Sequence, residues 1–273
     1  MVPAHSNIGR SGGASRLLWF ALAIGLMSLL LSLVIHPYVQ LSWWKIFRRS
    51  ASVSAVATLF MTIRYIRPQS LRSLGLSSWK DGKFEFLFGL FLGFGAILVI
   101  STGYLTARVF QVAVDPDRAQ VALRLFALLP AVGLIALVEE LIFRGYILEQ
   151  LLSYSPSFAV VGSSLAYALV HLRSYFEWPH TLLELLGLFF FGCVLALSRL
   201  RTKRLYLGMG LHASLAYCAL TNKWLVTFPH ARLHWLVGTS RLVNGLIPWL
   251  VLAGVAWVII RRTGTPTQGR QGA

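Results

Sequence analysis

The stretch LLPAVGLIALVEELIFRGYIL, residues 128–148, decides how the rest of the chain is interpreted. It carries no charged residue except Glu139, Glu140 and Arg144. An apolar run of about 20 residues is long enough to cross the hydrocarbon core of a bilayer as a helix. The stretch therefore predicts a membrane-spanning helix with charged side chains inside it.

The composition of the whole chain agrees with a membrane protein. Only 12% of its 273 residues are charged and 56% are hydrophobic, with a mean hydropathy of +0.68. Soluble domains carry about 25% charged residues, so an ordinary water-soluble globule and a disordered chain are both excluded. The net charge of +16 comes from short basic clusters between long apolar runs, which is typical of membrane proteins. We therefore do not expect nucleic acid as a partner.

The predicted fold is all-α, a polytopic transmembrane helix bundle of about eight spans with a polar cavity inside the membrane. We expect a single helical domain over residues 17–262, flanked by flexible tails at residues 1–16 and 263–273. The predicted spans are approximately Leu17–Ile35, Ser50–Ile66, Phe84–Leu105, Val121–Val138 and the following turns, Phe158–Phe176, Leu182–Leu197, Leu205–Leu220 and Leu242–Ile260.

The basic residues also predict an orientation. With eight spans both termini lie on one side, and 15 of the 25 Lys and Arg residues fall on that side. Short loops rich in Lys and Arg stay in the cytoplasm. We therefore expect an integral protein of a bacterial inner or plasma membrane, in contact with the lipid bilayer and with both termini in the cytoplasm.

Glu139, Glu140 and Arg144 are candidate functional residues. A charge at the bilayer centre costs at least about 2.5–3.5 kcal/mol, so such residues rarely occur without a function. Arg144 follows Glu140 by four residues, the spacing at which a helical Glu and Arg pair. Adjacent glutamates lie about 100° apart around a helix, so Glu139 faces a different neighbour. The alternative is that the helix ends near Glu139 and the charges lie at the membrane interface.

Two histidines complete the candidate site. His171 follows Tyr167 by four residues and shares its helix face, whereas His212 lies in the glycine-rich segment Gly208–Ser214. Each histidine alone is as consistent with helix packing. Together with the glutamates they form the usual parts of a hydrolytic site. They meet only if the fourth helix is long and continues to about Leu151, which we predict.

The ordered segments Glu139-Glu140-x-x-x-Arg144, Tyr167-x-x-x-His171 and His212 resemble the CPBP family, the CAAX prenyl endopeptidases and their bacterial relatives, also called the Abi family. The segment Leu71–Leu76 is similar to another recurring feature of that family, and the resemblance covers about residues 70–220. It implies an eight-helix intramembrane endopeptidase that hydrolyses a peptide bond of a membrane-associated or lipid-linked protein or peptide.

The resemblance also implies roles for these residues. Glu139 would be the general base that activates a water, with His171 helping to hold that water. Glu140 and Arg144 would form a supporting pair, and His212 would stabilise the oxyanion. The family resemblance leaves zinc open as a cofactor, in which case Glu139, His171 and His212 would be its ligands.

This chain departs from the family pattern at two positions. Tyr167 stands where the family usually has Phe, and Ala216 stands where the third motif commonly has an Asn that donates to the oxyanion. Ser214 and Tyr217 are the candidates for a replacement donor. The alternative functions are a catalytically weak or inactive relative that acts in immunity or as a scaffold, and a proton-coupled transporter.

Overall fold

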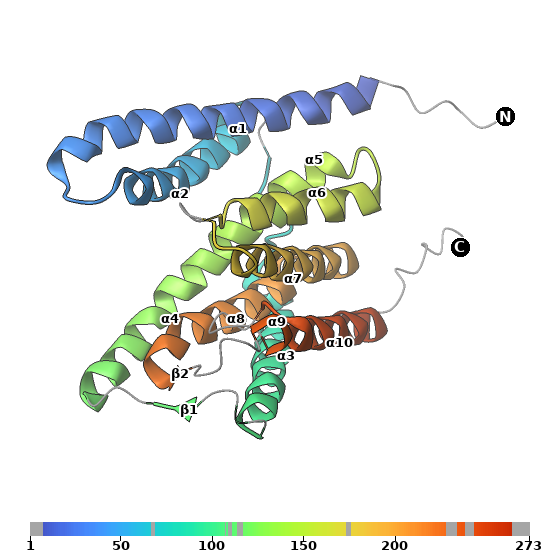
Figure 1. The fold of residues 1–273 in the computed structure, drawn as a ribbon. Coiled ribbons are helices and arrows are strands. Elements are labelled where there is room, and N and C mark those ends of the chain that lie inside the picture. Colours follow the sequence, from blue (N-terminus) through green and yellow to red (C-terminus); the bar gives the residue numbers. More distant parts are fainter. Residues whose placement is uncertain are drawn as a thin grey trace, which may run out of the picture.

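The computed structural model describes residues 8–66, 69–106, 108, 111–113, 117–172, 176–227, 234–237 and 243–263. Each of the eight predicted spans overlaps a helix, so the all-α prediction is confirmed (Figure 1). These helices are α1 (Ile8–Ile35), α2 (Trp43–Met61), α3 (Trp79–Thr106), α4 (Arg118–Glu140), α6 (Pro156–Leu169), α7 (His180–Thr202), α8 (Tyr206–Leu225) and α10 (Leu246–Thr263).

Not all eight helices have the length and hydropathy of a membrane span. Within the described ranges five helical runs do, and they are Gly12–Tyr38, Trp79–Thr106, Arg118–Leu151, His180–Thr202 and Leu246–Thr263. The helix α6 has only 14 residues and ends at Leu169, well before the predicted Phe176. The chain therefore spans a membrane, with some of its eight helices shorter or more polar than expected.

The helix α1 begins at Ile8, within the stretch predicted as the N-terminal tail. Residues 1–7 and 264–273 lie outside the described residues. In Figure 1 the start of α1 and the end of α10 lie on the same side of the molecule.

The helical run Arg118–Leu151, which carries Glu139, Glu140 and Arg144 and is called the charged helix below, is long, as predicted. Asp117 caps it by accepting a hydrogen bond from the Gln120 amide, and the helical run continues over 34 residues to Leu151. Its last part consists of a π-helical segment, η3 (Leu141–Ile147), and a short turn, α5 (Leu148–Leu151). Glu139 and Glu140 are followed by three further turns of helix, so the alternative in which the helix ends at Glu139 is wrong.

The helices α3 and α8 pack closely because glycines face each other across their interface. A Cβ on Gly89 of α3 would lie 2.2 Å from the Leu207 carbonyl oxygen, and one on Gly210 of α8 would lie 2.1 Å from the Phe86 carbonyl oxygen. Small residues allow membrane helices to approach to backbone contact. This contact fixes the position of α8 and hence of His212, which lies two residues after Gly210.

The helices α1 and α2 form a hairpin that lies side by side along one edge of the bundle (Figure 1). Buried serines and threonines line their packed faces, namely Ser28, Ser32, Ser50, Ser54 and Thr58. The hairpin contacts the end of the charged helix, since α1 packs against α5 and α2 against η3. It therefore covers the outer side of the segment that carries Arg144.

The remaining elements are short. A 3₁₀ turn, η1 (His36–Tyr38), follows α1, and a π-helical turn, η2 (Thr62–Ile66), extends α2. The strands β1 (Gln111–Val112) and β2 (Val226–Thr227) form an antiparallel pair that joins the start of α4 to the end of α8. The four-residue helix α9 (His234–Val237) packs against α10.

The α3–α8 contact gives a prediction with a control on the same helix. We expect Gly89→Ala to destabilise the protein by about 1–3 kcal/mol, because the new methyl group meets backbone atoms of α8 that cannot move independently. Gly95→Ala meets no atom within 4 Å and should be neutral or stabilising by up to about 1 kcal/mol. Thermal unfolding in detergent measures both variants. Equal unfolding temperatures would contradict the proposed backbone contact.

Candidate active site

A buried ion pair forms the centre of the site. Arg144 Nη1 donates to Glu140 Oε1 over 3.0 Å, and neither side chain is exposed. The two residues lie four apart on the charged helix, so the predicted pairing is confirmed. A second bond, from Arg144 Nη2 to the Gly192 carbonyl oxygen of α7, is 3.3 Å long. Arg144 therefore links the charged helix to α7.

The helix is wider where this pair forms. The ion pair begins at Glu140, the last residue of α4, and Arg144 lies in the π-helical segment η3. Such π-helical turns are rare and are found frequently at functional sites. Gly145 comes next, and a Cβ there would lie 3.1 Å from the Leu74 carbonyl oxygen. The segment thus combines a local expansion of the helix with close contact to its neighbours.

His212 lies between the two glutamates. Its Nδ1 is 3.1 Å from Glu140 Oε1, and its Nε2 is 3.5 Å from Glu139 Oε2. The His212 side chain is almost fully buried, whereas 25% of the Glu139 side chain is exposed. The Oε2 atoms of both glutamates are buried and make no direct hydrogen bond. The two carboxylates differ because Glu140 Oε1 is held by two partners, whereas the Glu139 side chain is partly exposed.

The structure adds Tyr167 to the site, which the sequence interpretation associated only with His171. The Tyr167 hydroxyl lies 3.4 Å from His212 Nε2, and the side chain is buried. The Arg144 guanidinium lies 4.5 Å from the centre of the Tyr167 ring, within the range of a cation–π contact. In the sequence, Tyr167 was noticed because it lies four residues before His171. That spacing does not show that Tyr167 reaches α8.

His171 lies just after the end of α6, and its Nδ1 is 2.8 Å from the Tyr167 carbonyl oxygen. In a continued α-helix the His171 amide would bond to that carbonyl, but here the amide bonds to the Ala168 oxygen instead. The imidazole therefore satisfies a carbonyl at the helix end, which is the physical reason why α6 can stop early. The His171 ring also packs against the Tyr167 ring, with ring centres 4.8 Å apart.

A glycine on α8 makes room for the buried carboxylate. A Cβ on Gly208 would lie 2.9 Å from Glu140 Oε2 and 3.1 Å from the Ser198 hydroxyl. Gly208 and His212 are four residues apart on α8, so both face α4. The glycine-rich segment identified in the sequence thus serves two contacts, one to α3 through Gly210 and one to Glu140 through Gly208.

The segment Leu71–Leu76 packs against the end of the site. Leu74 is almost fully buried, and the Gly75 carbonyl accepts a 2.9 Å hydrogen bond from the Leu205 amide just before α8. Gly75 has a φ of +94°, and a Cβ there would lie 2.8 Å from Arg199 Nε. Only glycine adopts this backbone conformation readily. The segment therefore joins the end of α7 and the start of α8 to the helix that carries Arg144.

The residues do not fit a three-ligand zinc site. Over the described part of the chain, no three His, Cys, Asp or Glu side chains lie together in a way that could hold a metal ion. Of the three ligands that the resemblance left open, Glu139 and His212 are close, whereas His171 Nδ1 contacts the Tyr167 backbone. We therefore derive no step through a metal.

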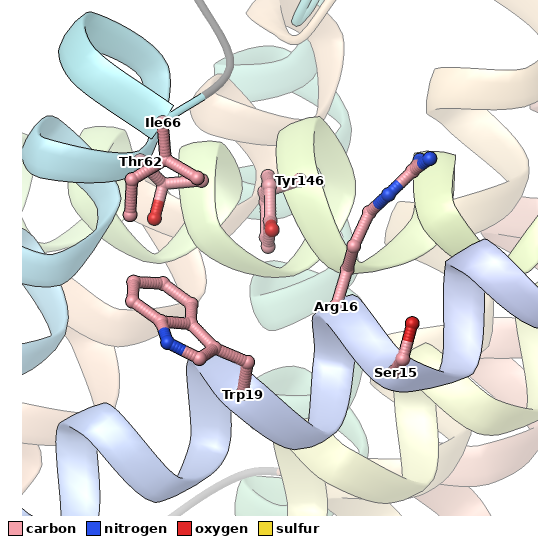
Figure 2. Close-up of a pocket in the computed structure, with 6 residues that line it drawn as sticks. All are labelled: Ser15, Arg16, Trp19, Thr62, Ile66 and Tyr146. Atoms are coloured by element: carbon pink, nitrogen blue, oxygen red, sulfur yellow. The ribbon is translucent and has the colours of Figure 1, made fainter.

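A cavity of about 590 Å³ lies outside the glutamate–histidine cluster. Figure 2 shows Ser15, Arg16 and Trp19 reaching into it from α1, and Thr62 and Ile66 from η2, with Tyr146 of η3 as its far wall. None of the predicted site residues lines this cavity. It lies between the α1–α2 hairpin and the helix that carries Arg144.

Comparison with known proteins gives one match. Residues 121–218 match the family model described as type II CAAX prenyl endopeptidase Rce1-like. The match includes Glu139, Glu140, Arg144, His171 and His212, and it agrees with the resemblance seen in the sequence. No curated protein and no solved structure matches the chain.

The buried ion pair gives a stability prediction. We expect Arg144→Met to destabilise the protein by about 3–5 kcal/mol, because it leaves Glu140 charged and buried without its partner. The control is Arg204→Met. Arg204 lies between α7 and α8 and donates a hydrogen bond to the Glu85 carboxylate, which raises the pKa of Arg204. That pair is partly exposed, so its loss should cost about 1 kcal/mol or less.

Thermal unfolding in detergent compares the two arginine variants with the parent protein. If Arg144→Met unfolds at the same temperature as Arg204→Met, the Glu140–Arg144 pair does not hold the site together.

Proposed function

We propose that this protein is an intramembrane endopeptidase that uses a glutamate-activated water, a function supported by the match of residues 121–218 to the Rce1-like model. The observation that carries the proposal is the position of His212, with one ring nitrogen toward each of two adjacent glutamates. The substrate would be a membrane-associated or lipid-linked protein or peptide.

The two carboxylates would have separate roles. Glu140 accepts from Arg144 and faces His212 Nδ1, so it holds other groups in place. The Glu139 side chain is 25% exposed, whereas Glu140 is fully buried and already faces Arg144 and His212, so Glu139 is the carboxylate to which we assign the water. A general base must lie within hydrogen-bond reach of the proton that it removes. We therefore assign the base to Glu139 and a positioning role to Glu140 and Arg144.

His212 would be the oxyanion donor in its protonated form. With Nδ1–H donated to Glu140, the remaining nitrogen faces Glu139 and the space beside it. Two glutamates, Arg144 and a protonated His212 sum to zero charge, and a low-dielectric site favours such balance. An N–H that is fixed in a poorly hydrated site stabilises a developing negative charge strongly.

The reaction then follows from these positions. Glu139 removes a proton from water, and the resulting hydroxide forms a bond to the carbonyl carbon of the substrate. The carbonyl oxygen becomes an oxyanion beside His212 Nε2–H. The C–N bond then breaks, and the proton held by Glu139 passes to the leaving amine. Water is consumed, and a carboxylic acid and an amine are formed.

His171 would support this site indirectly. It contacts Tyr167 through the backbone carbonyl and through ring contact, with ring centres 4.8 Å apart. Tyr167 in turn contacts His212. We therefore propose that His171 is a positioning residue, in place of the water-binding role that the resemblance implied.

The orientation expected from the basic residues remains part of the proposal. Both termini would lie in the cytoplasm of a bacterial cell, since 15 of the 25 Lys and Arg residues fall on that side. The segment Leu71–Leu76 and the loop between α7 and α8 would then lie on the cytoplasmic side, close to Arg144. A membrane-associated substrate would reach the site from that face.

The catalytic test replaces Glu139 with glutamine. We expect Glu139→Gln to lower the rate by about 10²–10⁴-fold, because the amide does not accept the proton of the water. The assay uses protein in phospholipid nanodiscs and an internally quenched peptide ending in Cys-aliphatic-aliphatic-X, with and without a farnesyl group. Glu149→Gln is the matched control, since Glu149 lies on the same helical run with a side chain that is 47% exposed.

Three outcomes distinguish the possibilities. Loss of cleavage in Glu139→Gln with retention in Glu149→Gln supports the glutamate base. Equal rates for Glu139→Gln and the parent protein would show that the base is another group. If the parent protein cleaves neither peptide faster than Glu139→Gln does, the protease function is wrong, and a non-catalytic role in the same fold gains support.

A further inference from the structure

We propose that the hydroxyl of Tyr167 is a second oxyanion donor of this site. The inference rests on the proposed endopeptidase function and adds a catalytic residue to it. Tyr167 lies on α6, a different helix from those that carry Glu139 and His212. Its hydroxyl is 3.4 Å from His212 Nε2, the nitrogen that also faces Glu139. The donor is therefore at the place where the negative charge would develop.

The other candidate donors near His212 are engaged elsewhere. The Ser214 hydroxyl donates to the Leu211 and Gly210 carbonyl oxygens, and it lies toward α3 where Gly93 approaches it. The Tyr217 hydroxyl donates to the Leu125 carbonyl oxygen over 3.4 Å. We therefore assign the donor role to Tyr167 and not to either of these two residues. Ala216 packs with the apolar cluster around Val132 and Ala136 and has no polar side-chain atom.

The hydrogen bond to His212 changes with the protonation state of the imidazole. In neutral His212 with its proton on Nδ1, Nε2 is an acceptor and takes the proton of the Tyr167 hydroxyl as a hydrogen bond. When His212 is protonated, Nε2 becomes a donor and no longer accepts. The Tyr167 O–H is then released from this partner and is able to donate to the substrate oxygen. The two donors become available together.

Three contacts hold the Tyr167 ring in place. Arg144 lies 4.5 Å from the ring centre, and Phe143 packs edge-on with ring centres 5.3 Å apart. His171 binds the Tyr167 carbonyl oxygen. The side chain is 2% exposed, so it has little room to rotate. A donor that is already oriented needs no reorganisation when the charge appears, which makes it more effective in catalysis.

The hydroxyl keeps its proton throughout the proposed reaction. It forms a hydrogen bond to the oxyanion and takes no part in bond formation or cleavage. The proton from water still passes through Glu139 to the leaving amine. The inference therefore adds a transition-state contact, which affects the rate constant kcat more than substrate binding.

The test removes only the hydroxyl. We expect Tyr167→Phe to lower kcat by about 10²-fold with KM little changed, since one oxyanion donor contributes about 10²–10³-fold. Tyr217→Phe is the matched control, because it removes a hydroxyl that bonds to the Leu125 carbonyl and is expected to keep the parental rate. Both variants are assayed in nanodiscs with the same quenched peptides.

A second measurement is independent of activity. In protein with ¹⁵N-labelled histidine, NMR reports the protonation and tautomer of His212. We expect Tyr167→Phe to shift the Nε2 resonance of neutral His212, because Nε2 loses its hydrogen-bond donor, and we expect Tyr217→Phe to leave that resonance unchanged. An unchanged Nε2 resonance in Tyr167→Phe would show that the contact does not exist in the membrane.

The outcomes separate this inference from the proposed function. If Glu139→Gln is inactive and Tyr167→Phe cleaves at the parental rate, the Tyr167 role is wrong and the glutamate mechanism stands. If Tyr167→Phe raises KM and leaves kcat unchanged, Tyr167 binds substrate and is not an oxyanion donor. If the parent protein cleaves neither peptide faster than Glu139→Gln does, both the function and this inference fail.

Discussion

The structure depends on how a membrane protein accommodates Glu140. A charged carboxylate with no solvent exposure is tolerated only when a fixed cation and hydrogen-bond donors surround it, and Arg144 supplies the first of these from the next turn of the same helix. The other side of Glu140 packs against α8, where His212 contacts Glu140 Oε1 and the missing side chain of Gly208 leaves room for Glu140 Oε2. The carboxylate is thus the point at which the charged helix and α8 meet.

Several features of the fold are explained by this requirement. The charged helix continues past the ion pair and widens into a π-helical segment, so that Arg144 also reaches the Gly192 carbonyl of α7. The glycine contacts between α3 and α8 fix the helix that carries His212. A shift of α8 would break its hydrogen bond to Glu140, so helix packing that lies away from the site contributes to the geometry of the site.

The adjacent glutamates illustrate how one helix provides two environments. They are neighbours in sequence, but the rotation of about 100° between them places Glu140 inside the bundle and leaves 25% of the Glu139 side chain exposed. The same rotation brings them to different nitrogens of His212. One carboxylate therefore lies fully buried against its partners, and the other keeps part of its side chain exposed.

The sequence alone determined the features that depend on composition and on spacing along one helix. These are the membrane helices, the continuation of the charged helix to Leu151 and the pairing of Glu140 with Arg144. Only the tertiary structure decided which groups meet across helices. His212 lies 72 residues from Glu140 and 45 from Tyr167, and spacing along the chain does not fix the relative rotation and depth of separate helices. For that reason the sequence paired Tyr167 with His171 on one helix face but did not show that Tyr167 reaches His212.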